Sequence, residues 1–293
     1  MRVTFWGVRG SIPTPGPATL HYGGNTTCIE IRTAEDDLII LDAGTGIHAL
    51  AQSLKPGEPV DAHILITHTH WDHIHGLPFF TPIFIPGNRL KIYGGQDPVT
   101  GEGIERALSV QLQYSYFPIR EAELNANVQY ETLKPGTTVQ IGAASVTPFL
   151  LNHPVLNFGY RVEADGKALF FTGDYEPPFN IYASGDREFQ AYQQIVDEQL
   201  QQVIWAMAEV DVLIVDASYT GEEYPSKQGW GHGTYQAAIQ QAAAAHVRQL
   251  IFTHHEPGRS DAQLDAIFAK VIARHGGGGV RYHMAREGLQ LQV

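Results

Sequence analysis

Four side chains that can bind a metal lie within six residues, directly after a segment with the pattern of a buried strand. The segment AHILITH (62–68) is almost continuously apolar, which is typical of strands covered on both faces in α/β proteins. It ends at His68, and His70, Asp72 and His73 follow. Such folds place functional residues at strand ends. The spacing therefore predicts a tight turn that can give one pair of these side chains to each of two neighbouring cations.

Short strand patterns alternate with helical patterns along the rest of the chain, separated by Gly, Pro and Asn clusters. Strands are predicted over residues 3–8, 27–33, 36–44, 62–68, 128–133, 137–142, 144–153, 158–165, 167–174, 211–217 and 248–255. Helices are predicted over Gly46–Leu54, Gly103–Tyr114, Asp186–Glu209, Thr234–His246 and Asp261–Arg274. Strand runs followed by helices in both halves predict an α/β fold of two sheets packed face to face, with helices outside each sheet.

The connections carry further predictions. Asp165 and Gly166 before Lys167 predict a hairpin turn. The segments Pro82–Glu102 and Glu176–Asp186 are predicted to be loops inserted over a site. No linker that would separate two units is evident, so residues 1–293 are expected to form a single domain.

The charge and cysteine content narrow the range of functions. The chain has 31 acidic and 19 basic side chains, a formal net charge of −12, which is the opposite of the footprint of a protein that binds nucleic-acid backbone widely. We therefore expect a small substrate and no extended nucleic-acid surface. The single cysteine, Cys28, cannot form an internal disulfide, so a metal site must use histidine and carboxylate. No secretory signal or membrane span is evident, which predicts a cytoplasmic protein without a membrane partner.

The motif HTHWDH (68–73) followed by Gly76 resembles the HxHxDH signature of the metallo-β-lactamase fold superfamily of dinuclear metal hydrolases. Three later motifs follow in the order typical of that family: Asn152-His153-Pro154, Thr172-Gly173-Asp174 and Thr253-His254. The resemblance covers almost the whole chain. It implies the four-layer αββα sandwich of that superfamily.

The resemblance also implies a set of ligands for two divalent cations. One metal would be bound by His68, His70 and His153, the second by Asp72, His73 and His254, and both by a bridging Asp174. Asp216, which also ends an apolar strand, competes with Asp174 for the bridging position, and His255 competes with His254. Asp42 resembles an aspartate of the family that orients the metal-binding loop without touching metal.

Ligands of this kind predict hydrolysis by an activated water. Nitrogen and oxygen ligands without cysteine suit zinc, and also manganese or iron. Two cations about 3.5–4 Å apart would hold a bridging hydroxide near neutral pH. Asp72 is expected to be essential for catalysis, because no other residue replaces it on its side of the site. No GxSxG nucleophile elbow is evident.

Two further motifs resemble the phosphodiesterase branch of the superfamily, which includes ribonuclease Z. The segment GWGHGT (229–234) contains His232, which by this resemblance would protonate the leaving group. The loops GVRGS (7–11) and GGNT (23–26) resemble loops near the metal cleft of that branch, where Arg9 would bind a phosphate oxygen of the substrate.

The expected function is therefore metal-dependent hydrolysis of phosphodiesters, with small or cyclic nucleotide diesters favoured. One alternative is tRNA 3′ processing as in ribonuclease Z, although no long basic arm is evident. Hydrolysis of lactones or β-lactams is another, and a non-catalytic metal-binding or scaffold protein is a third. A homodimer is compatible with these features.

Overall fold

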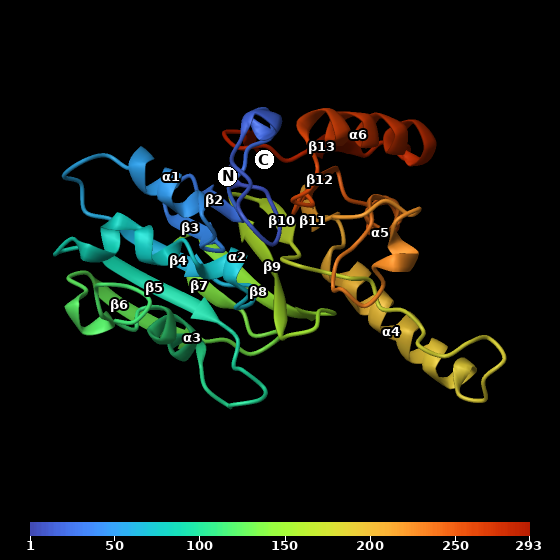
Figure 1. Cartoon of the computed structure of the whole chain (residues 1–293), viewed down its shortest axis with the longest axis horizontal. Helices are drawn as coiled ribbons and strands as arrows, with labels where there is room; N and C mark the ends of the chain where they lie inside the picture. Colours follow the sequence, from blue (N-terminus) through green and yellow to red (C-terminus); the bar gives the residue numbers. More distant parts are fainter.

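The structure is a computed structural model that describes residues 1–293, and it contains two seven-stranded sheets packed face to face (Figure 1). The first sheet has the strand order β14-β1-β2-β3-β4-β5-β6. Its strands are β1 (Arg2–Gly7), β2 (Cys28–Arg32), β3 (Leu38–Leu41), β4 (Asp61–Leu65), β5 (Arg89–Gly94), β6 (Asn127–Thr132) and β14 (Gln290–Gln292). Strands β3 to β6 run parallel to one another, and β1 pairs antiparallel with both β2 and β14.

The second sheet has the order β13-β12-β11-β10-β9-β8-β7. Its strands are β7 (Val139–Ile141), β8 (Ala144–Leu151), β9 (Asn157–Ala164), β10 (Lys167–Phe171), β11 (Val212–Asp216), β12 (Gln249–Thr253) and β13 (Arg281–Met284). Strands β10 to β13 are parallel, whereas β7, β8, β9 and β10 pair antiparallel in succession. The strand β14 that follows β13 returns to the first sheet and pairs with β1.

Helices cover the outer face of each sheet (Figure 1). The helices are α1 (Gly46–Ser53), α2 (Trp71–Ile74), α3 (Ile104–Gln111), α4 (Phe189–Ala206), α5 (Tyr235–Ala244) and α6 (Asp261–His275). Short 3-10 turns lie at Pro17–Thr19, Leu77–Phe79, Thr81–Phe84, Glu121–Glu123 and Tyr224–Ser226. None of the helices combines the length and the apolar character that crossing a membrane requires.

Three apolar clusters define the four layers. Between the sheets, side chains such as Leu65 of β4 and Phe171 of β10 form the central cluster. On the outer face of the first sheet, Ile64 packs with residues of α1 and α3, and on that of the second, Phe170 packs with residues of α4, α5 and α6. Successive residues of β4 and β10 thus enter different clusters, because side chains alternate along a strand. This explains why these strands are mostly apolar, and the predicted αββα sandwich is confirmed.

The predicted hairpin is present between β9 and β10, where Asp165 and Gly166 have φ angles of 57° and 69°. Two successive residues with positive φ are typical of the type I′ turn that suits a hairpin. The five predicted helices are also present, each within three residues of its expected ends. Thr234, expected to start a helix, is the N-cap of α5 and accepts a hydrogen bond from the backbone N–H of Ala237.

The prediction that Pro82–Glu102 is an inserted loop is wrong for its central part. Residues Arg89–Gly94 form β5, which pairs with β4 on one side and β6 on the other. Only its apolar residues are buried against neighbouring layers, Leu90 and Ile92 toward the helices and Tyr93 toward the other sheet. Glu176–Asp186 does lie between elements, as expected, after β10 and before α4.

The arrangement of strands brings the predicted site residues to one edge. Strands β3 and β4 of the first sheet and β10, β11 and β12 of the second end next to one another, because each set is parallel. Strand β8 has the same direction as β10, since both pair antiparallel with β9. The segments that follow these strands therefore converge between the two sheets.

Gly44 is closely packed against the backbone at this edge, and it gives a first prediction. A Cβ atom there would lie 2.3 Å from the carbonyl oxygen of Asp72 and 2.6 Å from that of Thr27. Both are backbone atoms, so Gly44→Ala must displace the segment that carries the HxHxDH motif. We expect the free energy of unfolding, measured by urea denaturation, to fall by about 1–3 kcal/mol.

The matched control is Gly185→Ala, because a Cβ at Gly185 meets no atom within 4 Å. This variant should unfold at the urea concentration of the wild type. Equal stability of the Gly44 and Gly185 variants would contradict the close approach described above.

Candidate metal centre

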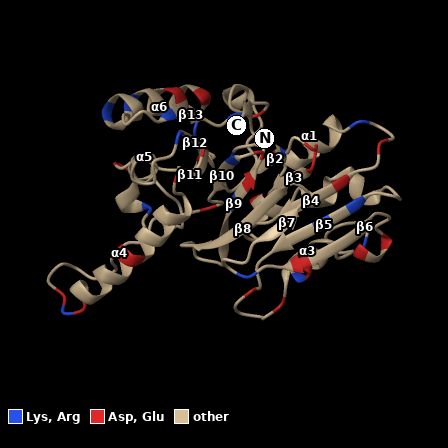
Figure 2. Ribbon diagram, turned by 180° about the vertical axis from the view of Figure 1, so that it is seen from behind, with Lys and Arg blue, Asp and Glu red and all other residues tan.

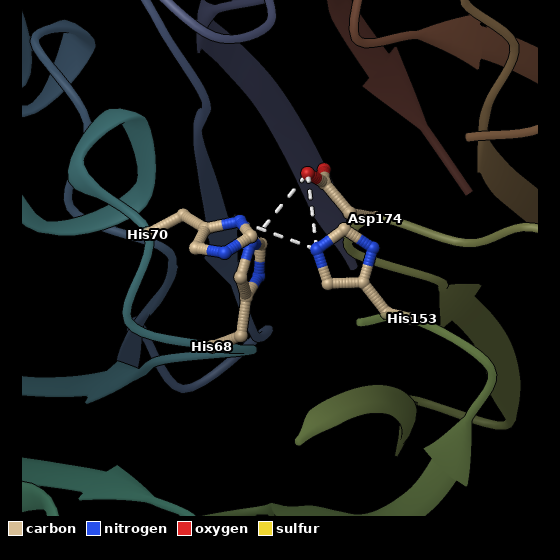
Figure 3. A group of neighbouring side chains, drawn as sticks. All are labelled: His68, His70, His153 and Asp174. Carbon is tan, nitrogen blue, oxygen red and sulfur yellow. Dashed lines mark hydrogen bonds and ion pairs between the residues drawn. The ribbon is translucent and has the colours of Figure 1, made fainter. Parts of the chain in front are cut away.

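Seven of the residues singled out from the sequence lie together at this edge. Two groups of four side chains have ligand atoms within 4.8 Å of one another, and both groups contain Asp174. The first group is His68, His70, His153 and Asp174, and the second is Asp72, His73, Asp174 and His254. The side chains of the first group converge from β4, β8 and β10 on a common point (Figure 3). All seven predicted ligands are therefore brought together.

The Asp174 carboxylate lies between the two groups. One of its oxygens, Oδ2, is 3.5 Å from Nε2 of His68 and 4.0 Å from Nε2 of His153. The other, Oδ1, is 3.1 Å from Nε2 of His73 and 3.0 Å from Nε2 of His254. One oxygen thus faces each group, which is the arrangement that a carboxylate bridging two cations requires.

Four of the five histidines present the same ring nitrogen to this space, because a protein acceptor binds the other one. Nδ1 of His73 donates to Asp42 at 2.7 Å, and Nδ1 of His153 donates to the carbonyl oxygen of Gly231 at 2.9 Å. Nδ1 of His68 lies 3.1 Å from Oγ1 of Thr67, and Nδ1 of His254 lies 3.1 Å from Oγ of Ser218. Both hydroxyls donate elsewhere, so each accepts from the imidazole. The Nε2 lone pairs then face Asp174, as metal ligation requires.

Several atoms at the centre are buried without a hydrogen-bond partner. They are Nε2 of His68, Nε2 of His73 and Oδ1 of Asp174. Buried polar groups normally have a partner, since leaving them without one costs free energy. A nitrogen and oxygen donor set with these orphaned atoms fits divalent cations.

Asp42 orients the HxHxDH motif through hydrogen bonds, as the sequence predicted. It is fully buried after β3. Its Oδ1 accepts from the backbone N–H of Thr67 at 2.7 Å, and its Oδ2 accepts from the Thr67 hydroxyl and from His73. One carboxylate therefore fixes both the end of β4 and the orientation of an imidazole in the HxHxDH motif.

His232 lies beside the two groups, in contact with a partner that the sequence did not assign to it. Its Nδ1 donates to Oδ2 of Asp216 at 2.8 Å, and its ring stacks on that of His254 with centroids 4.8 Å apart. Burial lowers the pKa of His232, but the Asp216 carboxylate raises it to about 9 overall. Cations bound nearby would act in the opposite direction, because a positive charge disfavours the imidazolium.

The loop that carries His232 is held by Glu176, which sequence analysis missed. This carboxylate is buried and accepts from the backbone N–H groups of Gly229 and Gly231, both at 2.8 Å, and from the hydroxyl of Tyr224 at 2.7 Å. Gly231 in turn accepts from His153. Glu176 therefore links the loop of the predicted proton donor to a predicted metal ligand. No sequence pattern points to it, because its partners are about 50 residues away.

The sequence left two alternatives open, Asp216 in place of Asp174 and His255 in place of His254. The positions of these residues in the structure decide between them. Asp216 lies with His232 and His254 in a third group that also contains Asp174, so it does not share Asp174's place between the first two groups. His255 points away from the centre, and its Nε2 donates to the carbonyl oxygen of Ala285 at 2.8 Å. Asp174 and His254 are thus the residues at the centre.

The expected contact of Arg9 with substrate phosphate needs correction. The Arg9 side chain is completely buried, and it donates to the carbonyl oxygens of Gly23 and Arg259, each at 2.8 Å. Its guanidinium also lies 3.6 Å from Asp261. A side chain with no accessible surface cannot reach a substrate in this structure, so Arg9 joins the N-terminal loop to the segment before α6.

The loop itself does lie at the centre, through its backbone. The N–H of Ser11 donates to Oδ2 of Asp72 at 2.7 Å. A Cβ at Gly10 would lie 2.2 Å from the His254 ring, so only glycine allows the loop to approach this closely. The similarity of GVRGS to loops near a metal cleft therefore reflects backbone contacts.

Protonation of the histidines depends on which carboxylates surround them. Burial lowers the pKa of His68 well below its usual value and also lowers that of His153. Burial opposes charge on His73 and His254 too, but Asp174 and other nearby carboxylates raise the pKa of each above its usual value. In the absence of cations, these carboxylates therefore favour protonation of His73 and His254.

Comparisons with known proteins agree with this geometry. A family model described as the Beta-lactamase superfamily domain matches residues 38–255. The chain is 26% identical over 287 residues to a protein named Ribonuclease Z from Staphylococcus haemolyticus, covering 87% of this chain and 88% of that one. It is 29% identical to Ribonuclease Z from Oenococcus oeni over 262 residues, covering 78% and 80% of the two chains.

Solved structures with the same fold include the metallo-beta-lactamase fold protein YhfI from Bacillus subtilis, with a TM-score of 0.70, 17% identity and 99% of both chains covered. Human tRNase Z, short form, superposes with a TM-score of 0.67 and 20% identity, covering 100% of this chain and 99% of that one. The predicted resemblance is confirmed. The chain belongs to the β-lactamase superfamily of metal-dependent hydrolases.

Proposed function

We propose that this protein hydrolyses phosphodiester bonds with two divalent cations bound at the centre. One cation would be bound by His68, His70 and His153, the other by Asp72, His73 and His254, and Asp174 would bridge them. The observation that carries the proposal is that the two oxygens of Asp174 face separate groups of ligands. A third group, with His232, lies directly beside them.

Two such cations supply a nucleophile from water near neutral pH and neutralise charge on a phosphate. The donor set of imidazole nitrogens and carboxylate oxygens suits zinc, and it also suits manganese and iron. We propose zinc as the resident metal.

His232 is the proposed proton donor to the leaving oxygen. Asp216 accepts from Nδ1, which fixes the ring and leaves Nε2–H as the donor. The Asp216 carboxylate also favours the imidazolium, the form that can give up a proton. Neither Ser218 nor Glu176 can take this role, because Ser218 holds the imidazole of His254 and Glu176 is engaged by the 224–231 loop.

A small diester is the proposed substrate, because the surface offers no basic track. Lys and Arg side chains are scattered, and α4, which extends from the body of the protein, carries none (Figures 1 and 2). Residues 177–206, the loop before α4 and the helix itself, contain four acidic side chains and one basic one. Such a projection repels a polyanion.

Processing of tRNA 3′ ends is the second candidate, and the relatives favour it. Proteins named Ribonuclease Z match this chain over most of both lengths. The expectation that the protein has no extended nucleic-acid surface therefore disagrees with the activity for which these relatives are named. The two candidates predict different effects of salt on activity. Binding of a polyanion such as tRNA releases counterions, so its affinity falls as the salt concentration rises.

Metal binding should be stoichiometric and should release protons. Elemental analysis of reconstituted protein should give two divalent ions per chain, and Asp72→Ala should retain about one. Because His73 and His254 have raised pKa values without cations, both must lose protons on ligation. Calorimetric titrations in buffers of different ionisation enthalpy should therefore detect proton release, and affinity should rise with pH. A maximum of one ion in the wild type would refute the bridged arrangement.

Replacement of His232 should affect substrates according to their leaving groups. His232→Ala should lower kcat by about 10²–10⁴-fold for diesters with poor alkoxide leaving groups. An activated 4-nitrophenolate needs little protonation and should be cleaved at close to the wild-type rate. His275→Ala, at the last residue of α6 and outside the groups around Asp174, is the control and should change neither rate. Equal losses on both substrates, or loss of bound metal in the His232 variant, would disprove the donor role.

A panel of substrates should distinguish the candidate functions. We expect cleavage of bis(4-nitrophenyl) phosphate and of at least one small or cyclic nucleotide diester, with kcat/KM nearly independent of salt. Precursor tRNA and a lactone complete the panel. Efficient tRNA cleavage with a steep salt dependence would favour the ribonuclease, and faster hydrolysis of the lactone than of every diester would favour carboxyl-ester chemistry.

A further inference from the structure

A pocket with a volume of about 760 Å³ lies directly beside the metal centre. Its walls come from the segment after β4, the end of β5, helix α3 with the turn that follows it, and Val155 and Leu156. His68 belongs both to this wall and to the proposed ligands, and Val155 lies two residues after His153. The volume is in the range of small-molecule sites. A substrate at the centre can therefore extend into this pocket.

Exposed aromatic rings line the pocket. Phe79 is 54% exposed and Tyr116 is 69% exposed, although both belong to a wall that is otherwise largely apolar. Phe117 packs edge-on against Phe79, with ring centroids 5.6 Å apart. Large aromatic side chains left open to solvent in one hollow indicate a binding surface, and such rings stack well on flat heteroaromatic groups.

We propose that this pocket binds the base of a nucleotide diester, stacked on Phe79 and Tyr116. A flat heteroaromatic ring can stack on these side chains, whereas an alkyl chain cannot. This inference rests on the proposed phosphodiesterase function and names its substrate class.

The position of His232 determines whether the pocket holds the leaving group of the diester or the group that stays on phosphorus. His232 lies with Asp216 and His254, and none of these three lines the pocket. The leaving oxygen belongs next to His232, so the base in the pocket belongs to the group that stays on phosphorus. Hydrolysis forms a P–O bond from water and breaks the P–O bond to the leaving group, which takes a proton. The product that stays beside the pocket is a nucleoside monophosphate.

The test compares diesters that share one leaving group. The substrates are the 4-nitrophenyl phosphate esters of methanol, of octanol and of thymidine at its 5′ oxygen. The reconstituted wild-type enzyme should cleave the thymidine ester with the highest kcat/KM. Tyr116→Ala and Phe79→Ala should each reduce this preference by about 5- to 150-fold, the range that loss of one stacking ring costs. The methyl ester has no base to stack, so its kcat/KM should fall less than that of the thymidine ester in both variants.

Tyr114→Ala is the matched control. Tyr114 lies on the same segment as Tyr116 and is 74% exposed, but it is outside this pocket. Its replacement should leave the preference for thymidine intact. A preference that falls equally in the Tyr114 and Tyr116 variants would overturn the assignment of the pocket.

The outcomes separate the pocket from the reaction. If all three esters are cleaved at similar rates, or the octyl ester is preferred, the base-binding inference fails while the proposed phosphodiesterase stands. If none is cleaved by the metal-loaded enzyme, the proposed function fails. Calorimetric binding of thymidine 5′-monophosphate, weakened by Tyr116→Ala and not by Tyr114→Ala, tests the pocket independently of turnover.

Discussion

The carboxylate of Asp174 is the group on which the arrangement of the site depends. It is buried at the end of β10, and imidazole nitrogens from both groups of ligands lie within 4.0 Å of its oxygens. A buried carboxylate without compensation is costly, so positive charge must lie next to it. Divalent cations would satisfy this need, and without them the carboxylates favour protonation of His73 and His254. The need for positive charge therefore holds the two groups of ligands around one residue.

Two residues that shape the site, Asp42 and His254, are among the seven non-glycine residues with a positive φ angle. Asp42 and His254 have φ angles of 60° and 58°, and neither is a glycine. Such conformations cost free energy of order 1–3 kcal/mol each and persist only where the surroundings determine them. Asp42 is determined by its bonds to Thr67 and His73, and His254 by Ser218, which contacts both its ring and its carbonyl oxygen. The strain is thus balanced by hydrogen bonds inside the site.

The sequence predicted the features whose signals are local, and it missed those that depend on contacts between distant segments. Strand β4 is apolar because both its faces are buried, and its ligands follow within a few residues, so pattern and spacing sufficed. Strand β5 is hidden in the sequence because its run RLKIYG is short, contains two charged residues and is bounded by Pro and Gly. The role of Arg9 was misjudged for a related reason. A sequence specifies a guanidinium but does not reveal that Gly23 and Arg259 enclose it.

Each sheet supplies only some of the proposed metal ligands, so cation binding would affect the packing of the two sheets as well as the chemistry. The first sheet contributes the HxHxDH segment, whereas β8, β10 and β12 of the second contribute His153, Asp174 and His254. Apolar packing between the sheets brings the two parts to the same edge, but it is not directional. Directed contacts also join the two sheets at this edge, among them those around Asp174 and the hydrogen bond from the hydroxyl of Tyr160 in β9 to the carbonyl oxygen of Ile66 after β4. Cations that bind only the assembled set would therefore stabilise the packing of one sheet on the other, since a ligand that binds the folded state alone shifts the folding equilibrium.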